Sequence, residues 1–230
     1  MLAFLRLHGQ RLRLFLHSYG RSLLALFFGL LFPLLAFVAI AAEVYEQDPF
    51  SFERPFMFAV HAQAAPPLDR LAASLAAFGN TPGMLPVTLI LAACLYRMRP
   101  RLTYFLMLSL AGSVVFHAVL KKVFDRPRPT LWTPIAPEAD FSFPSGHAMF
   151  AASLVSALVV LLWPTRWRWA ALVLGVGYVL TMMWSRVYSG VHYPTDVLAG
   201  ALVGLIWVMA LDRLLQGHRL LASPPQSESR

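Results

Sequence analysis

The stretch Leu102–Leu120, LTYFLMLSLAGSVVFHAVL, contains no Asp, Glu, Lys or Arg. A helix needs roughly 20 mainly apolar residues to cross the hydrocarbon layer of a membrane. The stretch is close to that length, so it predicts a membrane-spanning helix. Ser22–Ala42, SLLALFFGLLFPLLAFVAIAA, has the same character and predicts a second span near the N-terminus. Lipid is therefore the expected solvent for at least these two segments.

The composition of the whole chain extends this interpretation. Its 230 residues are 58% hydrophobic and 13% charged, which is more apolar surface than one soluble core can bury. Four further apolar runs, at 82–96, 145–163, 169–188 and 194–211, bring the predicted spans to six. The break at Gly79–Gly83 leaves Leu68–Phe78 as a separate helix at the interface or beneath the bundle. We expect an all-α, polytopic membrane protein built as a six-transmembrane-helix bundle.

Basic residues predict the orientation, because Lys and Arg in short loops favour the cytoplasm. They lie in the N-terminal tail and in two connections: Arg6, Arg11, Arg13, Arg21, Arg97, Arg99, Arg101, Arg166 and Arg168. The connection after the first span is mainly acidic, which suits the outside. Both termini are then cytoplasmic, with 1–21 as a basic tail, 22–213 as the membrane domain and 214–230 as a polar tail.

Several cations lie on the predicted outer side, against the usual bias. They are Lys121, Lys122, Arg126 and Arg128 after the third span, and Arg186 after the fifth. Taken alone, the first group is typical of a juxtamembrane segment that snorkels to lipid phosphates. An anionic ligand is the other explanation. The net charge of +8 does not indicate nucleic acid binding, because the basic residues lie in short loops between spans.

A second segment, Phe143-Pro144-Ser145-Gly146-His147, opens the fourth span. Ser145 suits a helix cap, Gly146 allows a ligand close to the backbone, and the free amides of a helix start attract anions. The segment predicts a phosphate cradle with an acid group attached. A capped turn with an interfacial histidine is the alternative.

A third segment is Ser185-Arg186, followed by His192-Tyr193-Pro194-Thr195-Asp196 at the start of the sixth span. Residues four apart share one face of a helix, so Asp196 is expected to lie beside His192. A carboxylate there fixes the tautomer of the imidazole and leaves its other nitrogen as a nucleophile. The alternative is a carboxylate stabilised by the helix dipole next to an unrelated histidine.

The three segments are predicted at one membrane face, and together they resemble a known signature. Lys121 with Arg128-Pro129, then Pro144-Ser145-Gly146-His147, then Ser185-Arg186 with His192 and Asp196, are similar to the three-part motif of the type 2 phosphatidic acid phosphatase superfamily. The resemblance implies that 22–213 is a six-helix membrane phosphatase domain with its active site at the outer membrane face.

The resemblance also implies a role for each signature residue. His192 attacks phosphorus and forms a phosphohistidine, Asp196 orients it, and His147 protonates the leaving oxygen and then activates water. The phosphate-binding residues are Lys121, Arg128, Ser145, Gly146 and Arg186. Neither a metal ion nor another cofactor is implied. His117, one turn before Lys121, is either a further residue of the site or, as we favour, a histidine buried between helices with a local partner.

The expected partners are a lipid phosphate substrate and membrane lipids, with no nucleic acid. The motifs read only the phosphate, so undecaprenyl diphosphate, phosphatidylglycerol phosphate, phosphatidic acid and lipid A phosphates all remain candidate substrates. The compact chain with short loops is typical of a bacterial inner (plasma) membrane protein with a periplasmic or extracellular site. Alternatives are a phosphotransferase that acts on another lipid, a noncatalytic protein that binds or moves anionic lipid, and a vanadium haloperoxidase, which the predicted spans disfavour.

Overall fold

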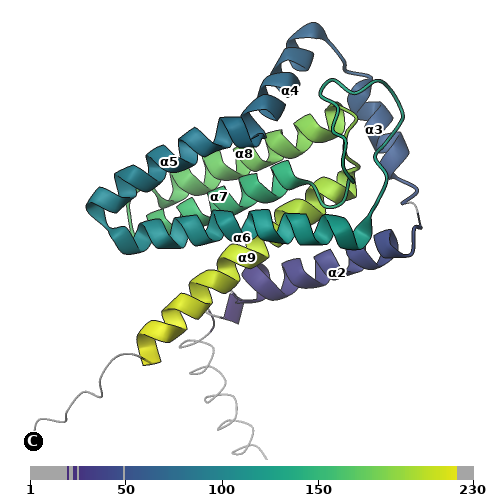
Figure 1. Ribbon diagram of the computed structural model, residues 1–230. Coiled ribbons are helices and arrows are strands. Elements are labelled where there is room, and N and C mark those ends of the chain that lie inside the picture. Colours follow the sequence, from purple (N-terminus) through teal and green to yellow (C-terminus); the bar gives the residue numbers. More distant parts are fainter. Residues whose placement is uncertain (1–19, 21–22, 25, 49, 222–230) are drawn as a thin grey trace, which may run out of the picture.

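The computed structural model describes residues 20, 23–24, 26–48 and 50–221, and all regular structure within them is helical (Figure 1). The all-α prediction is therefore confirmed. The predicted basic tail, apart from Gly20, and residues 222–230 of the predicted polar tail lie outside the described residues.

The helices follow the apolar runs of the sequence. They are η1 (Phe27–Leu31), α2 (Phe32–Tyr45), α3 (Glu53–His61), α4 (Pro66–Gly79), α5 (Thr81–Met98), α6 (Pro100–Phe124), α7 (Gly146–Leu162), α8 (Arg168–Tyr188) and α9 (Pro194–Leu221). Proline stands in the first turn of α4, α5 and α6, where its missing N–H leaves no helical hydrogen bond unmade. Only α3 was not predicted from the sequence.

The helices identify an integral membrane protein. Four segments are long and apolar enough to cross a membrane: Phe27–Tyr45, Pro100–Phe124, Arg168–Tyr188 and Pro194–Leu215. The bent pair α4 and α5 makes a fifth candidate if it counts as one span. α7 is apolar but has 17 residues. Four to five candidate spans are thus present by length and composition, and the count of six stays a prediction.

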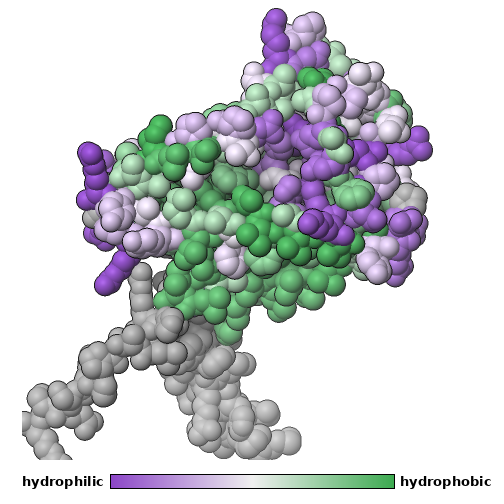
Figure 2. Space-filling model, viewed as in Figure 1, coloured by the Kyte–Doolittle hydropathy of each residue, from purple (hydrophilic) through white to green (hydrophobic). Residues whose placement is uncertain are grey.

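The molecular surface has the character expected in lipid. Figure 2 shows apolar side chains over the middle of the visible face and hydrophilic ones gathered towards its ends. Large apolar side chains are widely exposed, including Leu174 at 73%, Val173 at 68% and Ile90 at 63%. Exposure on this scale marks a surface that is covered by something other than water. Here the covering is the hydrocarbon layer, because these residues belong to the apolar helices.

α7 is the central helix and packs against α6, α8 and α9. Its approach to α9 depends on Gly200 and Gly204, because a Cβ at these positions would lie 2.4 Å from Ser145 O and 2.4 Å from Met149 O. Small residues allow membrane helices to bring their backbones together in this way. The close packing aligns the first turns of the two helices, and Ser145 N–H donates to Asp196 O at 3.0 Å.

The break predicted at Gly79–Gly83 is a bend of 59° between α4 and α5. α4 then lies against α8. The buried Tyr188 of α8 stabilises this contact with two hydrogen bonds. The Tyr188 hydroxyl donates to Asp69 Oδ1 at 2.5 Å and accepts from Ala65 N–H at 3.2 Å. The bend therefore brings the end of α4 beside the start of α7, where the sequence places a histidine.

Candidate active site

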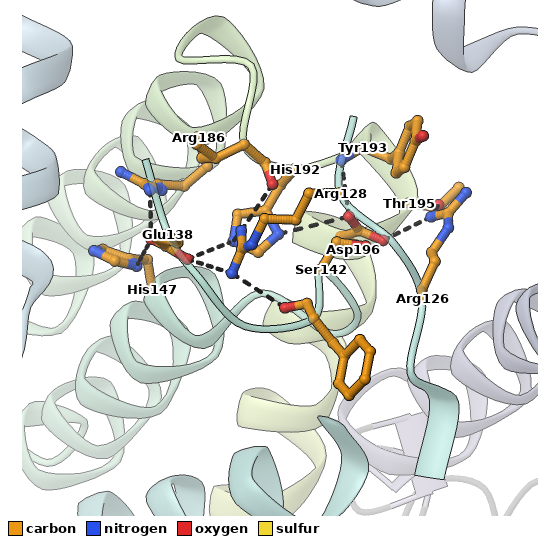
Figure 3. Close-up of polar contacts among 12 residues, drawn as sticks. Arg126, Arg128, Glu138, Ser142, His147, Arg186, His192, Tyr193, Thr195 and Asp196 are labelled. Atoms are coloured by element: carbon orange, nitrogen blue, oxygen red, sulfur yellow. Dashed lines mark hydrogen bonds and ion pairs between the residues drawn. The ribbon is translucent and has the colours of Figure 1, made fainter. Parts of the chain in front are cut away.

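The structure brings the sequence-predicted site residues together at one end of the bundle (Figures 1 and 3). They come from the end of α6, the α6–α7 loop, the start of α7, the end of α8 and the start of α9. The eight are Lys121, Arg128, Ser145, Gly146, His147, Arg186, His192 and Asp196. All are buried or half-buried. Their convergence follows from the helix packing, since each lies at or next to a helix terminus on the same side.

His192 and Asp196 form a buried pair around the first turn of α9. Both are fully buried, and His192 Nδ1 lies 3.5 Å from Asp196 Oδ2. On the other side of the ring, Arg128 Nη1 lies 3.2 Å from His192 Nε2. A guanidinium can only donate, so Nε2 is the acceptor and a neutral ring carries its proton on Nδ1, towards Asp196. The lone pair of Nε2 therefore faces the centre of the site.

Arg126 binds the Asp196 carboxylate through Oδ1, the oxygen that does not face His192. Its Nη1 donates to Asp196 Oδ1 at 2.6 Å, its Nη2 donates to Glu53 Oε2 at 2.7 Å, and its guanidinium lies 4.1 Å from the centre of the Tyr193 ring. Tyr193 N–H donates to Asp196 Oδ2 at 2.8 Å, and the Thr195 hydroxyl donates to Glu53. Both carboxylates are buried, and a buried charge needs such partners. The network fixes the orientation of the Asp196 carboxylate.

His147 points one nitrogen towards Glu138 and the other towards α4. Its Nε2 lies 3.1 Å from Ala76 O, and a carbonyl oxygen only accepts, so Nε2 carries a proton. Nδ1 faces the site, 3.6 Å from Glu138 Oε1. The ring fits because Gly79 has no side chain: a Cβ there would lie 2.3 Å from His147 Cδ2. Nδ1 is thus the nitrogen available for proton transfer within the site.

Two buried side chains keep unused polar atoms at the site. Arg186 and Ser145 are both fully buried. Among the described residues, Arg186 Nε and Nη1 and Ser145 Oγ find no hydrogen-bond partner. Buried polar atoms of this kind are normally satisfied, so their presence indicates a ligand. The first turn of α7, which carries Gly146, adds the free amides of a helix start. The site therefore has the donors that an anion with several oxygens requires.

The α6–α7 loop adds two carboxylates, Glu138 and Asp140, which the sequence analysis did not single out. Asp140 contacts Lys121 and also pairs with Arg128 Nη2 at 2.5 Å. Burial opposes the ionisation of Asp140, but these two cations outweigh it and lower the pKa of its carboxyl. Asp140 is therefore an anion at neutral pH.

Glu138 lies deeper in the site. Its carboxylate pairs with Arg186 Nη2 at 2.5 Å and with Arg128 Nη2 at 2.6 Å. Burial opposes ionisation here too, but His192 when its ring is protonated, together with the two guanidinium groups, holds the pKa of the Glu138 carboxyl well below its usual range. Glu138 is thus an anion among the predicted phosphate ligands.

A cavity of about 620 Å³ leads from the site into the apolar part of the bundle. Its polar end is lined by Lys121, Glu138 and His147, and its apolar end by Leu85 and Phe150. The cavity joins a charged pocket to the depth at which the helices face lipid. An amphiphile with an anionic headgroup suits this shape.

His117 also lines the cavity, which differs from its predicted role in helix packing. Its Nε2 is buried and has no hydrogen-bond partner within the described part of the chain. The ring lies against the start of α7, since a Cβ on Gly146 would be 2.6 Å from that nitrogen. The side chain is therefore available to a ligand in the cavity.

Gly79→Ala is expected to lower kcat by about 10- to 100-fold. The added methyl group displaces the His147 ring, and moving a group that takes part in catalysis by about 1 Å lowers the rate by up to about 100-fold. Gly177→Ala on α8 is the matched control, because a Cβ at Gly177 meets no atom within 4 Å. Steady-state phosphate release by both purified variants checks this. Equal kcat values for the two variants would show that the His147 ring tolerates the methyl group.

Comparison with known proteins agrees with this geometry. The family model of the PAP2 superfamily, the type 2 phosphatidic acid phosphatases, matches residues 102–219, a little over half of the chain. The chain belongs to the PAP2 superfamily. The matched range contains all eight predicted site residues, so the resemblance based on the three motifs is confirmed.

Two curated relatives are named as phosphatases of lipid phosphates. The chain is 31% identical to phosphatidylglycerophosphatase B of Bacillus subtilis over 179 residues, which cover 75% of this chain and 87% of that protein. It is 32% identical to undecaprenyl-diphosphatase of Sulfolobus acidocaldarius over 150 residues, or 63% of this chain and 69% of that one. The protein is therefore a membrane lipid phosphatase of the PAP2 family.

A solved PAP2 structure has the same fold. The crystal structure of the transmembrane PAP2-type phosphatidylglycerolphosphate phosphatase of Bacillus subtilis superposes with a TM-score of 0.74 at 25% identity. The superposition covers 81% of this chain and 96% of that one. The arrangement of helices around the site is thus the PAP2 transmembrane fold.

Proposed function

We propose that this PAP2 lipid phosphatase hydrolyses a lipid phosphate monoester or diphosphate through a phosphohistidine on His192, with no metal ion. One observation carries the proposal: His192 Nε2 and His147 Nδ1 each lie 3.6 Å from the Glu138 carboxylate, which Arg186 Nη2 contacts at 2.5 Å. Arg186 and Ser145 also keep polar atoms without a partner among the described residues. A nucleophile, a proton donor and an anion cradle are the three parts that such a reaction needs.

In the first step, the lone pair of His192 Nε2 attacks phosphorus, and the bond from phosphorus to the lipid oxygen breaks. The Nδ1 proton stays on the ring, which becomes cationic as Nε2 bonds to phosphorus, and the charge of Asp196, whose Oδ2 lies 3.5 Å from Nδ1, stabilises it. His147, protonated on Nδ1 in this step, gives that proton to the leaving oxygen. The products are the lipid alcohol, or lipid monophosphate, and a phosphohistidine.

In the second step, water replaces the histidine. His147 Nδ1, now unprotonated, takes a proton from water, whose oxygen attacks phosphorus and breaks the bond to His192 Nε2. The transition states of both steps carry extra negative charge on the phosphoryl oxygens. Lys121, Arg128 and Arg186 supply the positive charge that stabilises them, which is the part that a metal ion plays in other phosphatases.

The cavity supports a lipid substrate. Its apolar end would take part of an acyl or prenyl chain, while the headgroup lies beside Lys121 and His147. His117 also lines the cavity, and its Nε2, which has no hydrogen-bond partner among the described residues, would donate to the second phosphate of a diphosphate when it carries the ring proton. Undecaprenyl diphosphate is therefore our first candidate, with phosphatidylglycerol phosphate and phosphatidic acid next.

The charge distribution supports a site on the outer side of a bacterial inner membrane. Arg97, Arg99 and Arg101 lie at the α5–α6 turn, and Arg166 and Arg168 at the α7–α8 turn, both at the other end of the bundle. We propose six crossings, with α7 as the short central span and 22–213 as the membrane domain. Residues 1–21 and 214–230 are then cytoplasmic tails.

Phosphate release by the purified protein in detergent tests the proposal. The substrates are undecaprenyl diphosphate, phosphatidylglycerol phosphate, phosphatidic acid and a lipid A phosphate, each with and without EDTA. We expect release from at least the diphosphate, with EDTA changing the rate by less than about twofold, because side chains provide the positive charge. Loss of activity in EDTA would refute metal independence, and no release from any lipid would refute the substrate class.

A further inference from the structure

The carboxylate of Glu138 lies where the cations and both histidines of the site converge (Figure 3). Its Oε1 is 2.5 Å from Arg186 Nη2 and 3.6 Å from His147 Nδ1. Its Oε2 is 2.6 Å from Arg128 Nη2 and 3.6 Å from His192 Nε2. One side chain thus contacts four of the groups that are proposed to bind, attack or protonate the substrate.

This is the position that the phosphoryl group of the substrate needs. Attack requires phosphorus within about 3–3.5 Å of the nucleophile, and Glu138 Oε2 lies 3.6 Å from His192 Nε2. A phosphoryl oxygen bound to Arg186 Nη2 would take the place of Glu138 Oε1. The carboxylate and the phosphoryl group therefore cannot occupy the site together.

The loop is anchored on both sides of Glu138, so the exchange needs only a local movement. Ile135 N–H donates to Ser189 O at 3.4 Å, and Ser142 N–H donates to Arg126 O at 2.8 Å. The Glu138 side chain between these anchors is 22% exposed. It can leave the cations for water while the ends of the loop stay in place.

Glu138 and Asp140 also offset most of the positive charge of the site. Lys121, Arg128 and Arg186 converge there, and like charges at such short range repel one another strongly when they are shielded from water. Glu138 neutralises Arg186 and Arg128, and Asp140 neutralises Lys121 and Arg128. The three cations are thus held in position before a phosphate arrives.

We infer that Glu138 is an internal competitor for the phosphate position, which the substrate displaces and which returns as product phosphate leaves. This rests on the proposed function and adds a positioning residue to it. If the site is open only when Glu138 is out, every phosphate-like ligand loses affinity by the same factor. Removing the charge of Glu138 should therefore strengthen the binding of all such ligands equally. A purely structural residue would weaken binding when it is replaced.

Binding of inorganic phosphate and of vanadate to the purified full-length protein, measured by calorimetry, tests this inference without relying on turnover. We expect Glu138→Gln to lower both dissociation constants by about tenfold, in keeping with the strength of hydrogen bonds between charged groups. The KM for the lipid substrate should fall by the same factor. Glu138→Asp keeps the charge on a shorter side chain, so its dissociation constants should lie between those of the wild type and of Glu138→Gln.

Glu46→Gln is the matched control. Glu46 is exposed just after α2, at the same end of the bundle, where Tyr45 packs against Phe124. The Glu46→Gln variant should bind phosphate and vanadate with the same dissociation constants as the wild type. Unchanged or weaker binding by Glu138→Gln would overturn the inference. If the wild type binds phosphate but releases none from any lipid, the proposed function fails, while tighter binding by Glu138→Gln would still support the competitor.

Discussion

His192→Ala is expected to reduce phosphate release by about 10⁴-fold or more, the scale on which enzymes lose activity with their nucleophile. The imidazole is the group proposed to form the covalent intermediate, and no other side chain among the described residues places a ring nitrogen beside both Arg128 and Asp196. The measurement is the initial rate of inorganic phosphate release from a lipid diphosphate by detergent-purified protein.

His61→Ala controls for the loss of a histidine at the same end of the bundle. His61 ends α3 and stacks on Trp132 at 4.0 Å, outside the phosphate site, so its loss should leave the rate within about twofold of wild type. Quenching in alkaline detergent, which preserves a phosphohistidine, followed by digestion should show the label of a phosphorus-labelled substrate on His192 of the wild type and no label on His192→Ala. Comparable rates for His192→Ala and wild type would exclude His192 as the nucleophile.

The helices were predictable because each is encoded locally. An apolar run near the thickness of the hydrocarbon layer determines a span, and the runs at 102–120 and 169–188 lie inside α6 and α8. α3 was missed because it is short and polar at both ends, and it forms by packing against α8 and α9. α7 shows the limit of a length criterion, since a central helix of 17 residues is shielded from lipid by its neighbours.

The site was predictable where spacing alone brings residues together. His192 and Asp196 are four residues apart, and Ser145 to His147 are consecutive, so local helix geometry is sufficient to relate them. Their convergence with Arg186 needed the family resemblance, because it depends on how three helices pack.

The supporting residues were missed because their contacts are distant in sequence. Glu53 lies 73 residues before Arg126, and Ala76 lies 71 residues before His147. Glu138 stands alone in a proline-rich loop, with no neighbouring motif to mark it. The position of Arg126 in the sequence could have indicated its role. It lies two residues before the predicted phosphate ligand Arg128 but outside the signature, so it is a candidate for binding the carboxylate of Asp196.

Asp196→Asn is expected to lower kcat by about 10³- to 10⁴-fold, the scale seen when the carboxylate behind a catalytic histidine is replaced by its amide. The amide has no charge to stabilise the cationic ring, and its NH₂ group can turn towards His192 and favour the wrong tautomer. KM should change little, because Asp196 faces His192 Nδ1 and Arg126 rather than the phosphate position. Steady-state kinetics on one lipid substrate separates the two constants.

Asp48→Asn and Glu53→Gln make this prediction specific. Asp48 is exposed after α2, so its amide should leave both constants unchanged. Glu53 touches Arg126 but not His192, so Glu53→Gln should reduce kcat less than Asp196→Asn does, because it disturbs the orientation of the Asp196 carboxylate without removing its charge. If Glu53→Gln were the more damaging of the two, Asp196 would matter chiefly as a partner of Arg126 in the buried network, and the nucleophile would be oriented by some other group.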